Sequence, residues 1–149
     1  MRIRNVVGVA VGVALLLAAG CTASLQPVAI SRGETCFRCQ RTIANERIAA
    51  EILDQSGQAK KFRTVGCLAT YLAGEAGDVP NIYVTDYASG KLVRAGTANY
   101  VRTVIDTTTN ERDYLAFASF AQALKYSHDN KLQKPIDWSA VEVSVSSAN

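Results

Sequence analysis

The pattern of apolar and polar residues in the first half of the chain predicts short strands around one helix. Residues 47–53 (RIAAEIL) form an apolar run, the sequence DQSG follows as a turn, and residues 59–63 are predicted to return as a second strand. Thr64 can cap a helix that glycines and a proline end before residue 81. The apolar residues of this helix share one face: Val65, Leu68, Tyr71 and Leu72. Alternation over residues 81–87 and the run 92–94 predict two further strands.

The second half of the chain shows the same order of patterns. Residues 99–106 and 113–118 are predicted to form two strands joined by a turn. Ser119 can cap a helix that runs to about His128. Alternation over residues 138–144 predicts a last strand.

The two halves align without a gap at a separation of 55 residues, so that Phe62 matches Phe117. The alignment favours an internal repeat, although two amphipathic helices can also look alike by chance. A repeat predicts an α+β fold of two related ββαβ lobes, residues 36–95 and 96–149. Since a lobe of about 50 residues buries little apolar surface by itself, the two lobes are expected to pack together.

The N-terminus has the features of a bacterial lipoprotein signal peptide, residues 1–20. A short basic segment precedes the uncharged apolar run 6–19, which is too short for a typical membrane span. The sequence LAAGC that follows resembles a lipobox and predicts lipidation of Cys21, although an ordinary secretory signal with a chance cysteine is the alternative. Small and polar residues over 21–35 predict a tether, and Thr22 favours the outer over the inner membrane.

Composition narrows the possible functions. The chain has 149 residues, 48% of them hydrophobic and 19% charged, with a net charge of +3, so a large basic surface for nucleic acid is not expected. It has one histidine and no glycine-rich phosphate loop, which gives no support to a hydrolytic triad, and we expect no enzyme activity. Met1 is the only methionine, so the mature chain contains none.

Three cysteines remain after Cys21: Cys36 and Cys39, in a CxxC motif, and Cys67. An odd number argues against a complete disulfide framework, although a permanent Cys36–Cys39 disulfide stays possible. Gln40 after the motif excludes a c-type haem site. A thiol–disulfide redox pair, a copper(I) site and a zinc site remain, the last needing a fourth ligand.

The predicted position of Cys67 adds to this set. It falls in the first turn of the helix after Thr64, where the helix dipole favours a thiolate. The alternative is a buried cysteine that acts as a small apolar residue. If the strands before the helix return as predicted, all three sulfurs converge at one end of the sheet.

The order CFRCQR, RIAAEIL, KFRTVGCLATYL, YVTDY and AFASFAQALKYS resembles the NosL family of lipoprotein copper chaperones for nitrous oxide reductase assembly. The resemblance implies two related ββαβ lobes and copper(I) held by cysteine and methionine sulfur. The Cys-Gly-Met signature of the family falls on Cys39, Gln40 and Arg41, so only the cysteine is kept. Arg41 cannot bind a cation, and its charge is expected to oppose one.

These patterns together predict a lipid-anchored periplasmic metal-binding protein with Cys36, Cys39 and Cys67 as copper(I) ligands, and zinc as the alternative metal. It would act as a copper chaperone or store, with the membrane and a client metalloprotein or copper transporter as partners. A thiol–disulfide redox lipoprotein is the alternative function. A binding module with purely structural cysteines is the third.

Overall fold

The computed structural model describes residues 25–74, 79 and 81–148. The predicted signal peptide and the predicted lipidation site Cys21 lie outside the described residues. In the part of the chain that is described, no helix has the length and apolar character needed to cross a membrane.

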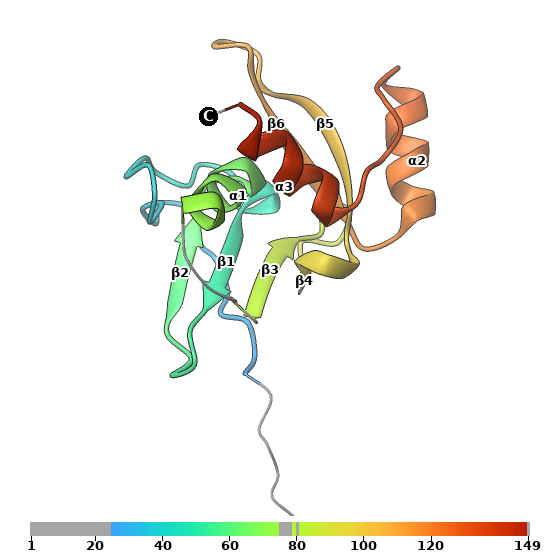
Figure 1. Ribbon diagram of the computed structural model, residues 1–149. Helices are drawn as coiled ribbons and strands as arrows, with labels where there is room; N and C mark the ends of the chain where they lie inside the picture. Colours follow the sequence, from blue (N-terminus) through green and yellow to red (C-terminus); the bar gives the residue numbers. More distant parts are fainter. Residues whose placement is uncertain (1–24, 75–78, 80, 149) are drawn as a thin grey trace, which may run out of the picture.

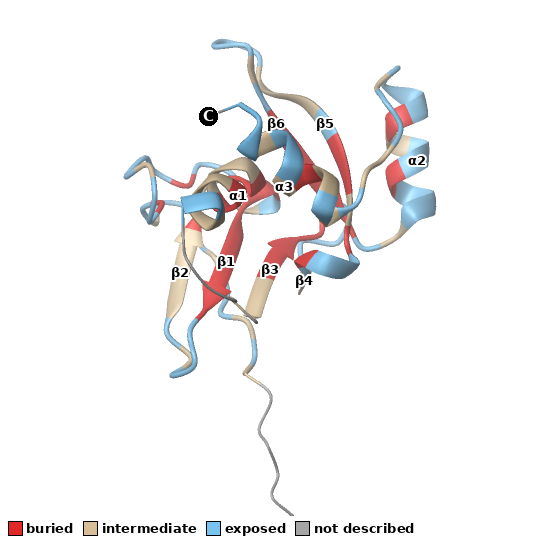
Figure 2. Cartoon of the chain, viewed as in Figure 1, coloured by how far each residue is buried: buried red, intermediate tan, exposed pale blue. Residues whose placement is uncertain are grey.

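The first half of the chain forms a four-stranded antiparallel sheet with the order β2-β1-β3-β4. Its strands are β1 (Ala50–Leu53), β2 (Ala59–Phe62), β3 (Asn81–Thr85) and β4 (Leu92–Arg94). The strands predicted in this half are present, but some are shorter than expected. The first begins at Ala50, because Arg47 and Ile48 belong to the 3-10 turn η1 (Glu46–Ile48), and the third ends at Thr85 instead of residue 87. Strand β1 lies between two neighbours and is buried along its whole length (Figure 2).

A hairpin of β5 (Asn99–Asp106) and β6 (Glu111–Phe117) forms the second sheet. An isolated parallel bridge between Asp86 and Ala116 connects the hairpin to the end of β3. There the Tyr87 N–H donates to the Ala116 carbonyl at 2.8 Å, and the Ala118 N–H donates to the Asp86 carboxylate at 3.0 Å. These bonds hold the two sheets together at a buried carboxylate.

Three helices complete the fold: α1 (Val65–Gly74), α2 (Phe120–Asp129) and α3 (Trp138–Ser146). Helices α1 and α3 pack on each other, and α1 also contacts β6 of the hairpin (Figure 1). Helix α2 packs on β5 and β6, away from α1. The main core draws on both halves of the chain, including Ala50, Phe62, Leu68, Tyr100 and Val141.

The prediction of a last strand over residues 138–144 is wrong, because this segment is helix α3. Asp137 caps the helix, accepting the Ala140 N–H at 2.9 Å. Trp138 and the buried Val141 lie three residues apart and both pack in the main core, whereas Val143 is 66% exposed. The valines that suggested strand alternation therefore follow a helical spacing, and the second half does not end as a ββαβ lobe.

Up to the helices, the two halves of the chain contain matching pairs of aromatic side chains. The rings of Phe62 and Tyr71 lie 5.3 Å apart at 43°, and those of Phe117 and Tyr126 lie 5.4 Å apart at 42°. A short 3-10 turn precedes the first strand in each half. The segments that follow the two helices differ. After α1, strand β3 pairs along the length of β1. After α2, the chain pairs with β5 at Ile136 alone among the described residues, in an isolated bridge to Tyr100.

The predicted tether packs on the sheet as far as the structure describes it. From Leu25 onward it crosses the sheet on the side of Glu51 and Tyr83, away from α1 (Figure 1). The Val28 N–H donates to the Glu51 carboxylate at 2.7 Å, and the Tyr83 hydroxyl donates to the Leu25 carbonyl at 3.2 Å. This segment covers the buried carboxylate of Glu51 and belongs to the folded part.

Candidate metal centre

The CxxC motif lies in a tight turn just before β1. The Gln40 N–H donates to the Cys36 carbonyl at 3.0 Å, and the Cys36 N–H donates to the Arg41 carbonyl at 2.9 Å. Gln40 has a φ of 58°, in the left-handed region that closes such turns. The Phe37 N–H donates to the Lys61 carbonyl at 2.7 Å, which joins the turn to the edge strand β2. The turn is thereby fixed by backbone hydrogen bonds at both ends.

The ring of Phe37 anchors the same turn beside helix α1. It lies 5.5 Å from the ring of Tyr71 and 6.2 Å from that of Phe62, both in edge-to-face geometry. The Lys60 ammonium lies 4.8 Å from the centre of the Phe37 ring. Such aromatic and cation–π contacts stabilise a partly exposed ring, and they hold the two cysteines of the turn close to the helix.

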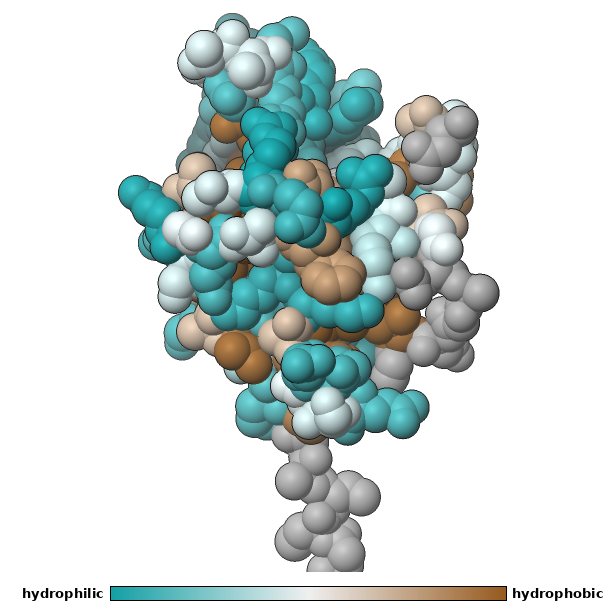
Figure 3. Space-filling model, turned by 90° about the vertical axis from the view of Figure 1, so that its left-hand side faces the viewer, coloured by the Kyte–Doolittle hydropathy of each residue, from teal (hydrophilic) through white to brown (hydrophobic). Residues whose placement is uncertain are grey.

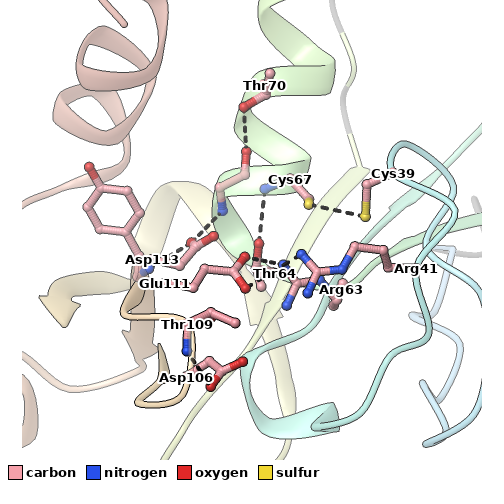
Figure 4. A network of polar contacts seen from close by, with 12 residues as sticks. Cys39, Arg41, Arg63, Thr64, Cys67, Thr70, Asp106, Thr109, Glu111 and Asp113 are labelled. Atoms are coloured by element: carbon pink, nitrogen blue, oxygen red, sulfur yellow. Dashed lines mark hydrogen bonds and ion pairs between the residues drawn. The ribbon is translucent and has the colours of Figure 1, made fainter. Parts of the chain in front are cut away.

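Cys67 is placed by the N-terminal turn of α1. Thr64 caps the helix as predicted, its hydroxyl accepting the Cys67 N–H at 3.1 Å. The Asp113 carboxylate of β6 accepts the Gly66 N–H at 2.7 Å (Figure 4). A Cβ on Gly66 would lie 2.6 Å from an Asp113 oxygen, so this close approach requires glycine. The sequence reading missed both Gly66 and Asp113, because only the folded chain brings β6 to α1.

The structure brings the three predicted cysteines together as free thiols. Their sulfurs all lie within 4.8 Å of one another, and those of Cys39 and Cys67 are 3.7 Å apart. Cys36 is buried, whereas Cys39 and Cys67 are half-buried. Three sulfurs about 2.3 Å from one metal ion in a plane would be about 4 Å apart, so small side-chain movements suffice to bind an ion.

The surroundings of Cys39 lower the pKa of its thiol, whereas those of Cys67 raise it. Burial opposes ionisation of Cys39, but the Arg41 N–H, the two other thiols and the Arg63 guanidinium lower its pKa to about 7. Burial dominates for Cys67 and raises its pKa to about 12, despite the hydrogen bond from Thr64. The expectation that the helix start favours a Cys67 thiolate is therefore wrong, and Cys39 is the more readily ionised thiol.

Two arginines stand beside the cluster and share one carboxylate. Arg63 pairs with Glu111, and Arg41 lies 3.6 Å from the same carboxylate (Figure 4). The Arg63 guanidinium also lowers the pKa of the Cys39 thiol. Three thiolates around one monovalent cation keep an excess of negative charge, so a nearby guanidinium stabilises the complex. Arg41 therefore need not oppose a metal ion, as it was expected to do.

The residues of the candidate centre determine which ligand atoms it can offer a metal ion. Within the described ranges, the cluster that could hold an ion consists of the three cysteines alone. His128 lies on α2 with its side chain 88% exposed and is not among them. Structural zinc sites almost always use four protein ligands, whereas thiolates select copper(I). The three cysteines could hold a metal ion through sulfur.

The surface around the cysteine turn is largely polar. Figure 3 views the side of the molecule that carries β2, and hydrophilic residues cover most of it.

No family model, no curated protein and no solved structure matches this chain.

Proposed function

We propose that this protein is a lipid-anchored, periplasm-facing metal-binding protein that carries or stores copper(I) in the manner of the NosL family. One observation carries the proposal: three free thiols lie within 4.8 Å of one another. Each is held by the fold, two in a hydrogen-bonded turn and one in the capped start of α1. Such a preorganised set of soft ligands suits copper(I).

The shape of the cysteine turn agrees with the proposed resemblance. Gln40 has a φ of 58°, a conformation that glycine adopts without strain. It stands where the Cys-Gly-Met signature has its glycine, directly after Cys39. A glycine would fit the backbone at this position, which agrees with aligning Cys39 with the cysteine of the signature.

The absence of a mature methionine bears on whether copper would be stored or delivered. Met1 lies in the predicted signal peptide, so the thioether of the family signature has no counterpart. Thiolates hold copper(I) more tightly than thioethers do, and Cys67 supplies the third sulfur in our proposal. A site of this kind favours storage, or exchange with a thiol-rich partner, over release to a weak client site.

Anaerobic titration with copper(I) against a chromophoric chelator tests the proposal. The wild-type protein is expected to bind one copper(I) ion per chain. Cys39→Ser is expected to bind the ion at least about 100-fold more weakly, because one of the sulfur atoms bound to copper is lost. Gln122→Ser is the control, because it changes an exposed residue of α2 that is not part of the cluster. Equal and weak binding of copper(I) by the wild type and Cys39→Ser would contradict the proposal.

Thiol–disulfide exchange is the second candidate function, and one observation favours it. Cys39 has a pKa of about 7, and its sulfur lies 3.7 Å from that of Cys67. A thiol of this pKa is a good nucleophile near neutral pH, and a neighbouring thiol can resolve the mixed disulfide that it forms. The measured reduction potential and turnover with an oxidoreductase partner decide this point, and a dithiol that never cycles would exclude it.

A further inference from the structure

A hollow next to the cysteine cluster carries a concentration of positive charge. It has a volume of about 390 Å³, and Cys67 is among the residues that line it. Three arginines from three separate elements line it: Arg38 of the CxxC turn, Arg102 of β5 and Arg112 of β6. The hollow is of a size that takes a small molecule.

The three arginines of the hollow lack the carboxylate partners that the arginines beside the cluster have. Arg38, Arg102 and Arg112 are exposed, and among the described residues none of them forms an ion pair. The only carboxylate in the wall is that of Asp113, which already accepts the N–H groups of Gly66 and Tyr114. The wall therefore offers guanidinium groups that its own carboxylate does not neutralise.

We propose that this hollow binds a small thiol that bears carboxylates, and that such a thiol exchanges copper(I) with the cysteine cluster. Arginine pairs with carboxylates through two parallel hydrogen bonds, so a ligand with more than one carboxylate fits a wall with three guanidinium groups. Cys67 belongs both to the wall and to the cluster, which brings the ligand's sulfur to the metal ligands. The inference rests on the proposed copper(I) function.

The exchange is a ligand substitution in which copper stays monovalent. A bond forms between copper and a protein sulfur, and the bond between copper and the carrier sulfur breaks. The proton leaves the protein thiol and ends on the departing carrier thiol. Cys67 is the protein thiol that an incoming ion meets first, because of the three cysteines it is the one that lines the hollow. No oxidant or reductant is needed.

Calorimetry with glutathione and S-methylglutathione as probes tests the hollow on the reduced, metal-free protein. Both probes carry the carboxylates and are expected to bind, and the variant Arg102→Gln/Arg112→Gln is expected to bind them about tenfold more weakly. The matched control is Lys91→Gln/Lys134→Gln, which removes the same charge at exposed sites outside the hollow. Equal binding by the two double variants, or no binding to the wild type, would overturn the assignment.

Copper transfer from two donors completes the test. Copper(I)–glutathione is expected to load the wild type faster than copper(I)–mercaptoethanol, an uncharged donor, and the arginine variant should lose this preference. If the donors load the protein equally, the inference fails while the proposed function stands. If the probes bind but copper(I) does not, the proposed function fails and the anion site remains. An acidic peptide without a thiol that binds more tightly than glutathione would assign the hollow to a protein partner and overturn the inference.

Discussion

Replacing Gly66 by alanine tests how the two halves of the chain jointly position Cys67. A Cβ at this position would lie 2.6 Å from one Asp113 oxygen and 2.9 Å from the other, distances that a relaxed structure does not allow. Either the Asp113 side chain or the first turn of α1 must move, and the hydrogen bond from Gly66 N–H to Asp113 at 2.7 Å is lost or lengthened. Cys67 follows in the same turn and moves with it.

The expected magnitude follows from two opposing terms. A hydrogen bond to a charged group contributes about 1.5–3 kcal/mol, and its loss leaves a buried Asp113 carboxylate short of a donor. Alanine in place of glycine within a helix increases the free energy of unfolding by about 1 kcal/mol. Gly66→Ala is therefore expected to lower the free energy of unfolding by about 0.5–2 kcal/mol, which for a domain of this size lowers Tm by about 5 °C.

Urea denaturation and thermal melting measure the effect, with Gly74→Ala as the matched control. Gly74 also lies in α1, and no described atom lies within 4 Å of a Cβ placed there. This control is expected to keep or raise stability by up to about 1 kcal/mol. If Gly66→Ala proves as stable as Gly74→Ala, the close contact between α1 and Asp113 is refuted. The copper(I) affinity of Gly66→Ala is also expected to fall, because Cys67 is displaced.

Three further predictions concern ionisation and capping. Alkylation of Cys39 by iodoacetamide should reach half its maximal rate near pH 7. Cys67, with a pKa of about 12, should react far more slowly at that pH, and mass spectrometry after timed treatment measures both rates. Burial raises the pKa of Glu51, so the free energy of unfolding should decline as pH rises above the ordinary glutamate value of about 4.3, and Glu51→Gln should remove this decline in urea titrations. Asp137→Ala removes the cap of α3 and should cost about 1 kcal/mol by denaturation; no loss would contradict the capping contact.

Local sequence signals were sufficient for most elements of the fold. The cap at Thr64 and the apolar spacing that follows it predicted α1 correctly. The segment after Asp137 was misread because Val141, Val143 and Val145 alternate with small and polar residues, and valine favours strands. The helical alternative was present in the same residues, since the capping Asp137, Trp138 and Val141 have the spacing of a helix start with one buried face.

The candidate site divides in the same way between local and long-range features. The CxxC motif and Cys67 could be found in the sequence, because their residue type limits their chemistry. The contribution of Asp113 and Glu111 could not, since both lie on β6, more than 40 residues beyond Cys67, and reach the site only through tertiary packing. The same holds for the arginine-lined hollow, whose charged residues come from three elements.

Burial also decides the ionisation of the cysteines, which the sequence pattern alone cannot give. Position in the first helical turn favours a thiolate at Cys67, but desolvation outweighs this effect and raises its pKa to about 12. Cys39, for which no helix start was predicted, is instead stabilised as a thiolate by backbone and side-chain donors. Ionisation therefore depends on the folded surroundings of each sulfur.

X-ray absorption at the copper edge of the copper(I)-loaded protein tests the central claim most directly. The three-thiolate site predicts about three sulfur neighbours at about 2.3 Å from copper, falling to two in Cys67→Ser. A first shell dominated by nitrogen or oxygen, or a sulfur shell unchanged in Cys67→Ser, would contradict the assignment of Cys36, Cys39 and Cys67 as a shared copper(I) site.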